Sequence, residues 1–222
     1  MRAMIRFGKE PRLRFISHLD LQRFFQRALN RTGLPIAYTQ GFNPHPVMSF
    51  GSALALGWTS EYEILDIKLS VPMGRKRTEE AMRSALPEDL PVLETRMVDD
   101  RHPAPMAQVK ASDYRITLPE ARVEAFHRAL AAFSQMDSVK AVRKTKSGEK
   151  EIDIRPLALQ MEPTKTGLWA RLSLTEKCTL KPDLWLDALA GLVGEPPVEA
   201  RIHRLCLLGM DAEGALKPLM EL

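Results

Sequence analysis

The stretch that decides the fold is SHLDLQRFFQRALNRTGLPIAYTQGFNPHP, Ser17–Pro46. Between Leu19 and Thr32 the apolar side chains recur at the 3.6-residue period of an amphipathic α-helix. Ser17 offers a hydroxyl that can cap this helix, and Asp20 places a carboxylate beside its positive end. The GLP tripeptide at 33–35 predicts where the helix ends. We therefore expect a helix that is followed at once by a stiff, proline-rich loop.

Strand patterns surround this helix in the first hundred residues. Short alternating or apolar runs predict strands at Arg2–Phe7, Ile36–Thr39, Met48–Leu56, Tyr62–Val71 and Leu90–Val98. A second helix is predicted at Arg77–Ala85. Apart from one additional strand, these elements follow the order β-α-β-β-α-β of a ferredoxin-like unit.

The second half of the chain repeats this pattern after a break. Two prolines in Asp99–Gln108 indicate a linker or crossing segment. Beyond it, the sequence predicts helices at 119–135 and 181–192, a turn at Ser147–Lys150, and strands at Ser112–Leu118, Val139–Thr145, Glu151–Leu159, Leu168–Leu174 and Glu199–Leu208. We therefore predict the α+β class and, within it, tandem ferredoxin-like domains at 1–100 and 111–222, joined by a linker at 101–110.

The composition excludes several kinds of protein. Apolar residues make up 45% of the chain and charged residues 27%, which is typical of globular domains. No apolar run is long enough to span a membrane, and the first residues lack the apolar core of a secretory signal. The two cysteines, Cys178 and Cys206, are far apart, so neither a disulfide framework nor a cysteine-rich metal site is expected. We expect a cytoplasmic protein.

Positive charge is concentrated at the start of the chain. Residues 1–50 carry eight arginines and lysines against two acidic residues, a net charge of +6. The whole chain has a net charge of +4, so the remaining residues hold −2. This asymmetry predicts a polyanionic partner, nucleic acid before membrane. A solvated basic face without a ligand is the alternative.

Three arginines of the predicted helix, Arg23, Arg27 and Arg31, follow one another at four-residue steps and form one stripe opposite the apolar face. Guanidinium groups in such a row can each bind phosphate oxygens of a nucleic-acid backbone. We predict that the stripe binds RNA, together with Arg14 of the same basic segment. The alternatives are a solvated face and pairing with acidic residues of a partner protein.

The loop GFNPHP, Gly41–Pro46, is stiff because prolines flank His45 on both sides and restrict its backbone. A loop of this kind presents its side chains at a low entropic cost. Asn43 and His45 can hydrogen-bond a nucleotide, and Phe42 can stack on a base or pack onto the protein. We predict that these three side chains contribute to RNA binding.

His18 and His45 are the candidates for acid–base catalysis, since an imidazole titrates near neutral pH. On the helical wheel His18 falls near Phe25 and Leu29, which favours a half-buried structural histidine. For His45 the structural and functional interpretations are equally supported. His18 and Asp20 are two positions apart on a helix and do not face each other, so no metal site is expected. The phosphate-loop, zinc-protease and dinucleotide motifs are absent from the sequence, and no cofactor is expected.

Three stretches resemble a known family: LRFISHLDLQRFFQRAL (Leu13–Leu29), LPIAYTQGFNPHPVMSFGSALALG (Leu34–Gly57) and SEYEILDIKL (Ser60–Leu69). Weaker similarity continues to IDIRP (Ile152–Pro156) and to the final RIHRLCLL run. The chain resembles the radical-SAM-linked proteins, a family whose domain has no assigned function. The resemblance implies a cytoplasmic bacterial protein that works with a radical SAM enzyme. The chain itself lacks the CxxxCxxC run that holds the iron–sulfur cluster of such an enzyme.

Three functions are compatible with these features. The first is an RNA-binding accessory protein, for tRNA or ribosomal RNA, that presents a substrate to a radical SAM enzyme. The second is a metal-independent endoribonuclease that uses His18 or His45; the paired ferredoxin-like domains of CRISPR repeat-processing endoribonucleases offer a fold analogy for it. The third is a protein–protein adaptor of the radical SAM enzyme without RNA contact. We favour the first, because the positive charge and the stiff loop occur together.

Overall fold

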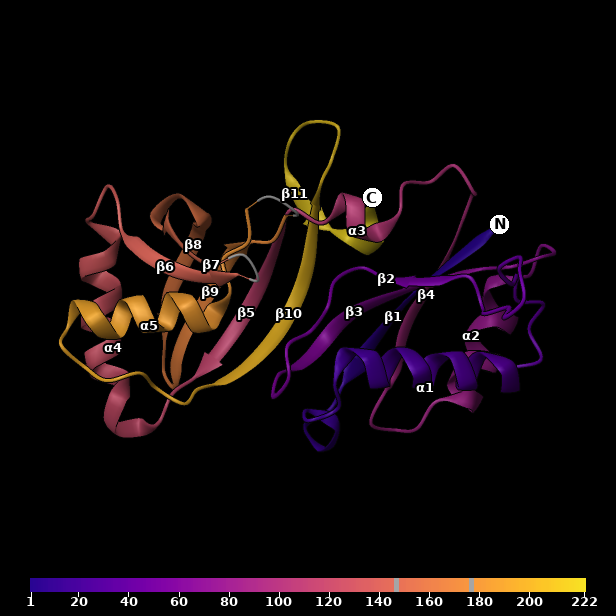
Figure 1. The fold of residues 1–222 in the computed structure, drawn as a ribbon, viewed down its shortest axis with the longest axis horizontal. Coiled ribbons are helices and arrows are strands. Elements are labelled where there is room, and N and C mark those ends of the chain that lie inside the picture. Colours follow the sequence, from indigo (N-terminus) through magenta and orange to yellow (C-terminus); the bar gives the residue numbers. More distant parts are fainter. Residues whose placement is uncertain (146–147, 176–177) are drawn as a thin grey trace. The chain divides into compact units, whose positions relative to one another are not determined.

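The computed structural model describes residues 1–145, 148–175 and 178–222. The predicted α+β class is confirmed, since five α-helices accompany an extended β-sheet within the described residues. The chain divides into two compact units, unit 1 (Met1–Val109 with Cys206–Leu222) and unit 2 (Lys110–Leu205), whose elements are labelled in Figure 1. Among the described residues, no helix has both the length and the apolar character needed to cross a membrane.

Unit 1 is built on antiparallel strand pairs. Its helices are α1 (His18–Arg31), α2 (Arg75–Ala85) and α3 (Pro105–Gln108), with 3-10 turns at Pro11–Leu13 and Leu219–Glu221. Its strands are β1 (Arg2–Lys9), β2 (Met48–Phe50), β3 (Thr59–Lys68), β4 (Val92–Val98), the end of β10 (Arg201–Met210) and β11 (Leu216–Pro218). β1 lies between β4 and β3, β2 pairs with β3, and β11 pairs with β10, each time antiparallel.

The core of unit 1 lies beneath α1. Leu21, Phe25 and Leu29 occupy the buried face of the helix, as its 3.6-residue period predicts. The Phe25 ring packs on Phe7 of β1 and on Phe50 of β2, with ring centroids 4.8 Å and 5.6 Å apart. Burial of such side chains stabilises a helix more than its intrinsic propensity does. α1 is therefore held by its inner face, and its outer face is left to solvent.

Local interactions set both ends of α1. The Ser17 hydroxyl accepts a hydrogen bond from Asp20 N at 3.2 Å and donates one to Asp20 Oδ2 at 2.7 Å, which confirms the predicted cap. At the other end Gly33 has a φ of +65°, a left-handed conformation that favours glycine. The helix therefore begins and ends where its sequence signals predict.

Two strand predictions in unit 1 are wrong. Ile36–Thr39 forms only isolated bridges, because prolines next to it and at the end of the loop interrupt regular pairing. The predicted strand Met48–Leu56 stops at Phe50. The residues that follow turn toward the segment before α1, where Gly57 N donates to the Arg14 carbonyl at 2.8 Å.

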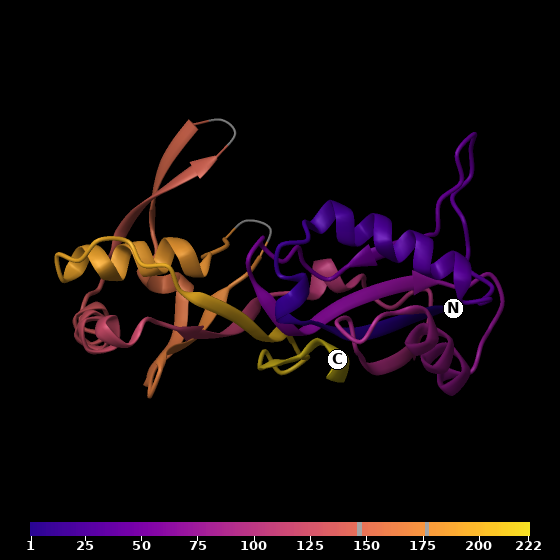
Figure 2. The same cartoon turned by 90° about the horizontal axis from the view of Figure 1, so that it is seen from below.

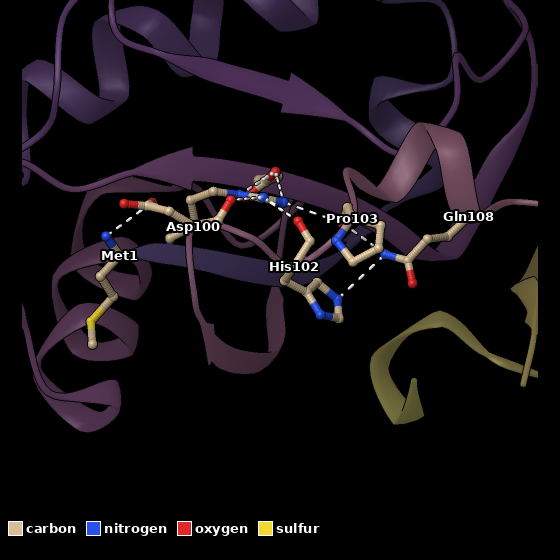
Figure 3. Close-up of polar contacts among 7 residues, drawn as sticks. Met1, Asp100, His102, Pro103 and Gln108 are labelled. Atoms are coloured by element: carbon tan, nitrogen blue, oxygen red, sulfur yellow. Dashed lines mark hydrogen bonds and ion pairs between the residues drawn. The ribbon is translucent and has the colours of Figure 1, made fainter. Parts of the chain in front are cut away.

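The segment Asp99–Gln108, predicted as a linker or crossing segment, includes α3 and is bonded to β1 (Figure 3). The Arg2 guanidinium binds both carboxylate oxygens of the buried Asp66, at 2.8 Å and 3.1 Å. Figure 3 also shows the Met1 amino group, which lies 3.0 Å from the Asp100 carboxylate. In addition, Arg2 donates to three backbone carbonyls of the segment at 2.5–3.3 Å, those of Asp100, His102 and Pro103.

Unit 2 has helices α4 (Glu120–Ser134) and α5 (Pro182–Leu192) against the antiparallel strands β5 (Ala111–Thr117), β9 (Gly167–Ser173) and β8 (Ala158–Thr164), which are neighbours in that order. β6 (Lys140–Thr145) and β7 (Gly148–Asp153) form a separate antiparallel hairpin. Phe133 of α4 meets Trp185 of α5 edge to face at 6.2 Å in the core. Of the predicted turn, Ser147 lies outside the described residues, and Gly148–Lys150 belongs to β7.

The predicted strand Glu151–Leu159 is wrong. β7 ends at Asp153, and a 3-10 turn at Arg155–Leu157 leads into β8, which the sequence pattern did not predict. The Asp153 carboxylate accepts hydrogen bonds from the backbone N–H of Val139 and from that of the first residue of the 3-10 turn. Pro156 offers no N–H for a strand ladder. An aspartate followed by a proline therefore divides what looked like one strand into two.

Candidate nucleic-acid interface

The arginine stripe, Arg23, Arg27 and Arg31, lies on the exposed side of α1, opposite its buried face. Arg23 is 3.3 Å from the carboxylate of Asp20, but both side chains are more than half exposed and such a pair contributes little stability. Arg31 donates one long bond, 3.4 Å, to the Ala85 carbonyl. For Arg27 the described part of the chain supplies no hydrogen bond or ion pair. All three guanidinium groups are available to a ligand.

Two exposed apolar side chains precede the arginines in the chain. Leu19 lies one four-residue step before Arg23 on α1 and is 62% exposed, and Phe15 precedes the helix and is 67% exposed. The Arg14 guanidinium lies 4.4 Å from the centroid of the Phe15 ring and donates to the Pro11 carbonyl at 3.1 Å. We call Arg14, Phe15, Leu19 and the arginine stripe together the α1 surface. Sequence reasoning missed Phe15 and Leu19. The four-residue step that singles out the arginines also reaches Leu19, whereas Phe15 precedes the helix and has no such signal.

The proline loop, Gly41–Pro46, is exposed up to His45, and the Phe42 side chain is fully exposed. Two hydrogen bonds close the base of the loop: Thr39 N donates to the His45 carbonyl at 2.9 Å, and His45 N donates to Thr39 Oγ1 at 3.0 Å. The Tyr38 hydroxyl donates to Asn30 Oδ1 of α1 at 2.6 Å. In Figure 2 the segment after α1 rises as a narrow loop beyond the C-terminal end of that helix. The loop therefore extends the α1 surface at this end.

His18 and His45 are not brought together. His18 opens α1, whereas Tyr38, which pairs with Pro46 at the end of the proline loop, is bonded to Asn30, about 18 Å further along the helix axis at the usual rise per residue. The His18 ring stands edge to face against Phe50 at 5.1 Å, which makes it the half-buried histidine that the helical wheel favours. Burial lowers the pKa of His18, while the Glu63 carboxylate opposes this shift and the Lys9 ammonium adds to it.

A buried lysine supports the segment before α1, and sequence reasoning missed it. Lys9 is 1% exposed, and its Nζ donates to the carbonyls of Arg14 at 3.3 Å and Ile16 at 3.0 Å. Burial lowers the pKa of Lys9, and the Glu63 carboxylate, itself buried on β3, opposes that shift. An alternating strand pattern at the start of a chain gives no signal that its last lysine points inward.

The described residues contain no group of three or more histidine, cysteine, aspartate and glutamate side chains placed to hold a metal ion. The α1 surface and the proline loop present cations, aromatic rings, and amide and imidazole groups that can form hydrogen bonds. Groups of these kinds can bind phosphates and bases.

Comparison with known proteins places the chain in a family. No curated protein matches it. One family model, described as "Uncharacterized protein conserved in bacteria (DUF2344)", matches residues 2–183, which include the whole α1 surface and the proline loop. The chain belongs to this bacterial protein family.

Proposed function

We propose that this protein is an RNA-binding accessory protein whose RNA site is the α1 surface with the proline loop. One observation carries the proposal: three exposed arginines without strong internal partners lie in a row on one helix and lead to an exposed aromatic loop. Guanidinium groups in a row bind successive phosphates by charge-assisted hydrogen bonds and release counterions. Asn43 and His45 would hydrogen-bond the nucleotide on which Phe42 stacks.

Binding is better supported than cleavage. A metal-independent ribonuclease needs an acid and a base close to one ribose. His18 and His45 belong to opposite ends of α1, so each imidazole would have to act alone. The edge-to-face contact of His18 with Phe50 also favours a packing role for that ring.

A partner enzyme is part of the proposal. The resemblance to the radical-SAM-linked proteins supports a radical SAM enzyme as the partner. We propose tRNA or ribosomal RNA as the molecule that both bind. Cys178 and Cys206 are too few to hold an iron–sulfur cluster, so the radical chemistry would belong to the partner. The protein would then act in the cytoplasm of a bacterium, in RNA modification or maturation.

We also infer tandem ferredoxin-like folds for the two units. The chain order β-α-β-β-α-β and the antiparallel neighbours β4-β1-β3-β2 support this fold for unit 1. The strand order β10-β5-β9-β8 supports it for unit 2, with the β6–β7 hairpin inserted between α4 and β8.

A salt titration of binding to bulk bacterial tRNA, followed by fluorescence anisotropy, tests the RNA site. Phosphate contacts from Arg14 and the arginine stripe predict a slope of roughly −3 for log K against log salt. In the Arg23→Glu/Arg27→Glu/Arg31→Glu variant the slope should fall to about −1 and affinity at low salt should be largely lost.

The control variant is Arg75→Glu/Lys76→Glu/Arg77→Glu, which makes the same change of charge on the exposed start of α2. It should bind tRNA nearly as well as the wild type. Equal losses in both variants would mean that net charge alone is responsible. No binding by the wild type at low salt would refute the RNA function and leave a protein adaptor; cleaved tRNA that disappears with His18→Ala or His45→Ala would instead identify an endoribonuclease.

A further inference from the structure

We propose that the RNA taken by this site is unpaired, and that its bases stack on Phe15 at one end of the arginine stripe and on Phe42 at the other. The inference rests on the proposed function, and it adds the class of RNA and a contact, Phe15, that the charge pattern does not predict. Each base of a single strand has a free face for stacking, whereas the bases of a duplex are already stacked on one another.

Phe15 is an exposed aromatic side chain, and the backbone on either side of it is bonded to a buried lysine. The buried Lys9 ammonium binds the carbonyls of both neighbours of Phe15, Arg14 and Ile16. Gly57 N donates to the same Arg14 carbonyl at 2.8 Å. Lysine is rarely buried to this degree, because its charge loses its hydration. These bonds fix the backbone on both sides of Phe15, whose ring is 67% exposed.

The surroundings of Phe15 suit a base. The Arg14 guanidinium, 4.4 Å from the ring centroid, is a planar cation that can stack on a base or bind the adjoining phosphate. Leu19 of α1, 62% exposed, lies four residues further along the chain and offers a second exposed apolar side chain. Proteins that bind single strands combine these same components, aromatic rings for the bases and cations for the backbone.

Phe42 provides the second stacking point. It is fully exposed at the tip of the proline loop, whose base is closed by two hydrogen bonds between Thr39 and His45. Tyr38, which pairs with Pro46 at the end of the loop, is bonded to Asn30 near the C-terminal end of α1, while Phe15 precedes the N-terminal end. The arginine stripe lies between the two rings, with about 6 Å of helix axis between successive arginines. That step is comparable to the distance between neighbouring phosphates of an extended strand.

The test compares two fluorescent RNAs of the same length, an unstructured oligouridine and a perfectly paired duplex, in anisotropy titrations with the full chain. The wild type should bind the oligouridine more tightly than the duplex. Phe15→Ala and Phe42→Ala should each weaken oligouridine binding roughly 5- to 100-fold and leave duplex binding unchanged. Leu93→Ala, which truncates an exposed apolar side chain on β4, is the matched control and should change neither affinity.

Lys9 is a positioning residue in this scheme, and a double-mutant cycle tests it. Lys9→Met should weaken oligouridine binding about as much as Phe15→Ala, because the first substitution frees the segment that carries the ring and the second removes the ring itself. In the Lys9→Met background, Phe15→Ala should then have little further effect. Independent, multiplying losses would overturn this role for Lys9. If Lys9→Met does not fold, the two phenylalanine variants decide the proposal alone.

The outcomes separate the inference from the proposed function. Equal binding of duplex and oligouridine, or full oligouridine affinity in both phenylalanine variants, would overturn the single-strand inference. The RNA function would survive that result if tRNA binding is still lost in the arginine-stripe variant. A wild type that binds neither RNA nor tRNA would overturn both.

Discussion

Replacing Arg2 should destabilise unit 1 strongly, because its guanidinium is the counter-charge of a buried carboxylate. Asp66 is 6% exposed, and Arg2 holds both of its oxygens. Breaking a buried pair by removing one partner costs about 3–5 kcal/mol, since the other charge stays buried. Three carbonyls of the 99–108 segment lose a donor in the same substitution. We expect Arg2→Met to lower the free energy of unfolding of unit 1 by at least ~3 kcal/mol, a large part of the usual 5–15 kcal/mol.

Arg6→Met is the matched control, since Arg6 lies on the same strand and the same face. Its pair with Glu94 is longer, 3.7 Å, and both side chains are about one-third exposed or more. Such a pair contributes about 1 kcal/mol at most, and the contact of Arg6 with the Tyr62 ring, 4.9 Å, adds a similar amount. Arg6→Met should therefore lower the free energy of unfolding of unit 1 much less than Arg2→Met does.

Hydrogen exchange of β1 and β3 amides in native protein, measured by mass spectrometry, reads the stability of unit 1 separately from unit 2. Amides of the 99–108 segment should exchange faster in Arg2→Met and at the wild-type rate in Arg6→Met. A loss below about 1 kcal/mol in Arg2→Met, or equal losses in the two variants, would refute the reasoning that the burial of Asp66 sets the cost.

Three further predictions concern pH and backbone space. Burial raises the pKa of Tyr62 to about 12, so the folded state keeps the phenol proton at a pH where the unfolded chain loses it. The free energy of unfolding should therefore fall as the pH rises from 10 towards 12. In urea titrations this fall should be smaller for Tyr62→Phe. Burial lowers the pKa of His18, so the neutral ring's contribution to folding stability is complete above pH 6.5 and is lost as the pH falls further. The melting temperature should therefore fall less steeply between pH 7 and 5 in His18→Gln than in the wild type. A Cβ on Gly167 would lie 2.1 Å from the Ile116 carbonyl oxygen, so Gly167→Ala should lower the free energy of unfolding in urea by at least ~2 kcal/mol. A Cβ on Gly191 of α5 would meet open space, so Gly191→Ala should stabilise unit 2. Equal effects of the two substitutions would contradict the steric reason.

The elements that depend on near neighbours could be predicted from the sequence. α1 follows from its apolar period, from the Ser17 cap and from the glycine that ends it, and all of these interactions span a few residues. β2 and β8 could not be predicted at their true lengths. β2 stops where the chain turns back to the carbonyl of Arg14, and β8 starts after a turn that depends on the Asp153 carboxylate.

The residues of the candidate site, too, could be predicted from the sequence only in part. The arginine stripe and the proline loop are visible in the sequence, because helix period and proline stiffness are local properties. The role of Lys9 is not visible, because its partners are carbonyls that only the fold brings to it and a carboxylate, Glu63, on another strand. Phe15 is not visible in the sequence either, because it precedes the helix and the backbone beside it is held by Lys9.

By itself, the sequence determined the α+β class, the helix α1 and the excess of positive charge in the first fifty residues. Only the tertiary structure decided which of those charges face solvent. Arg2 and Arg6 are engaged by Asp66 and Glu94 on neighbouring strands, and Lys9 is buried, whereas the arginine stripe remains exposed. The physical reason is that a charge is neutralised by whatever lies beside it in space, and strand pairing brings those partners from more than fifty residues away.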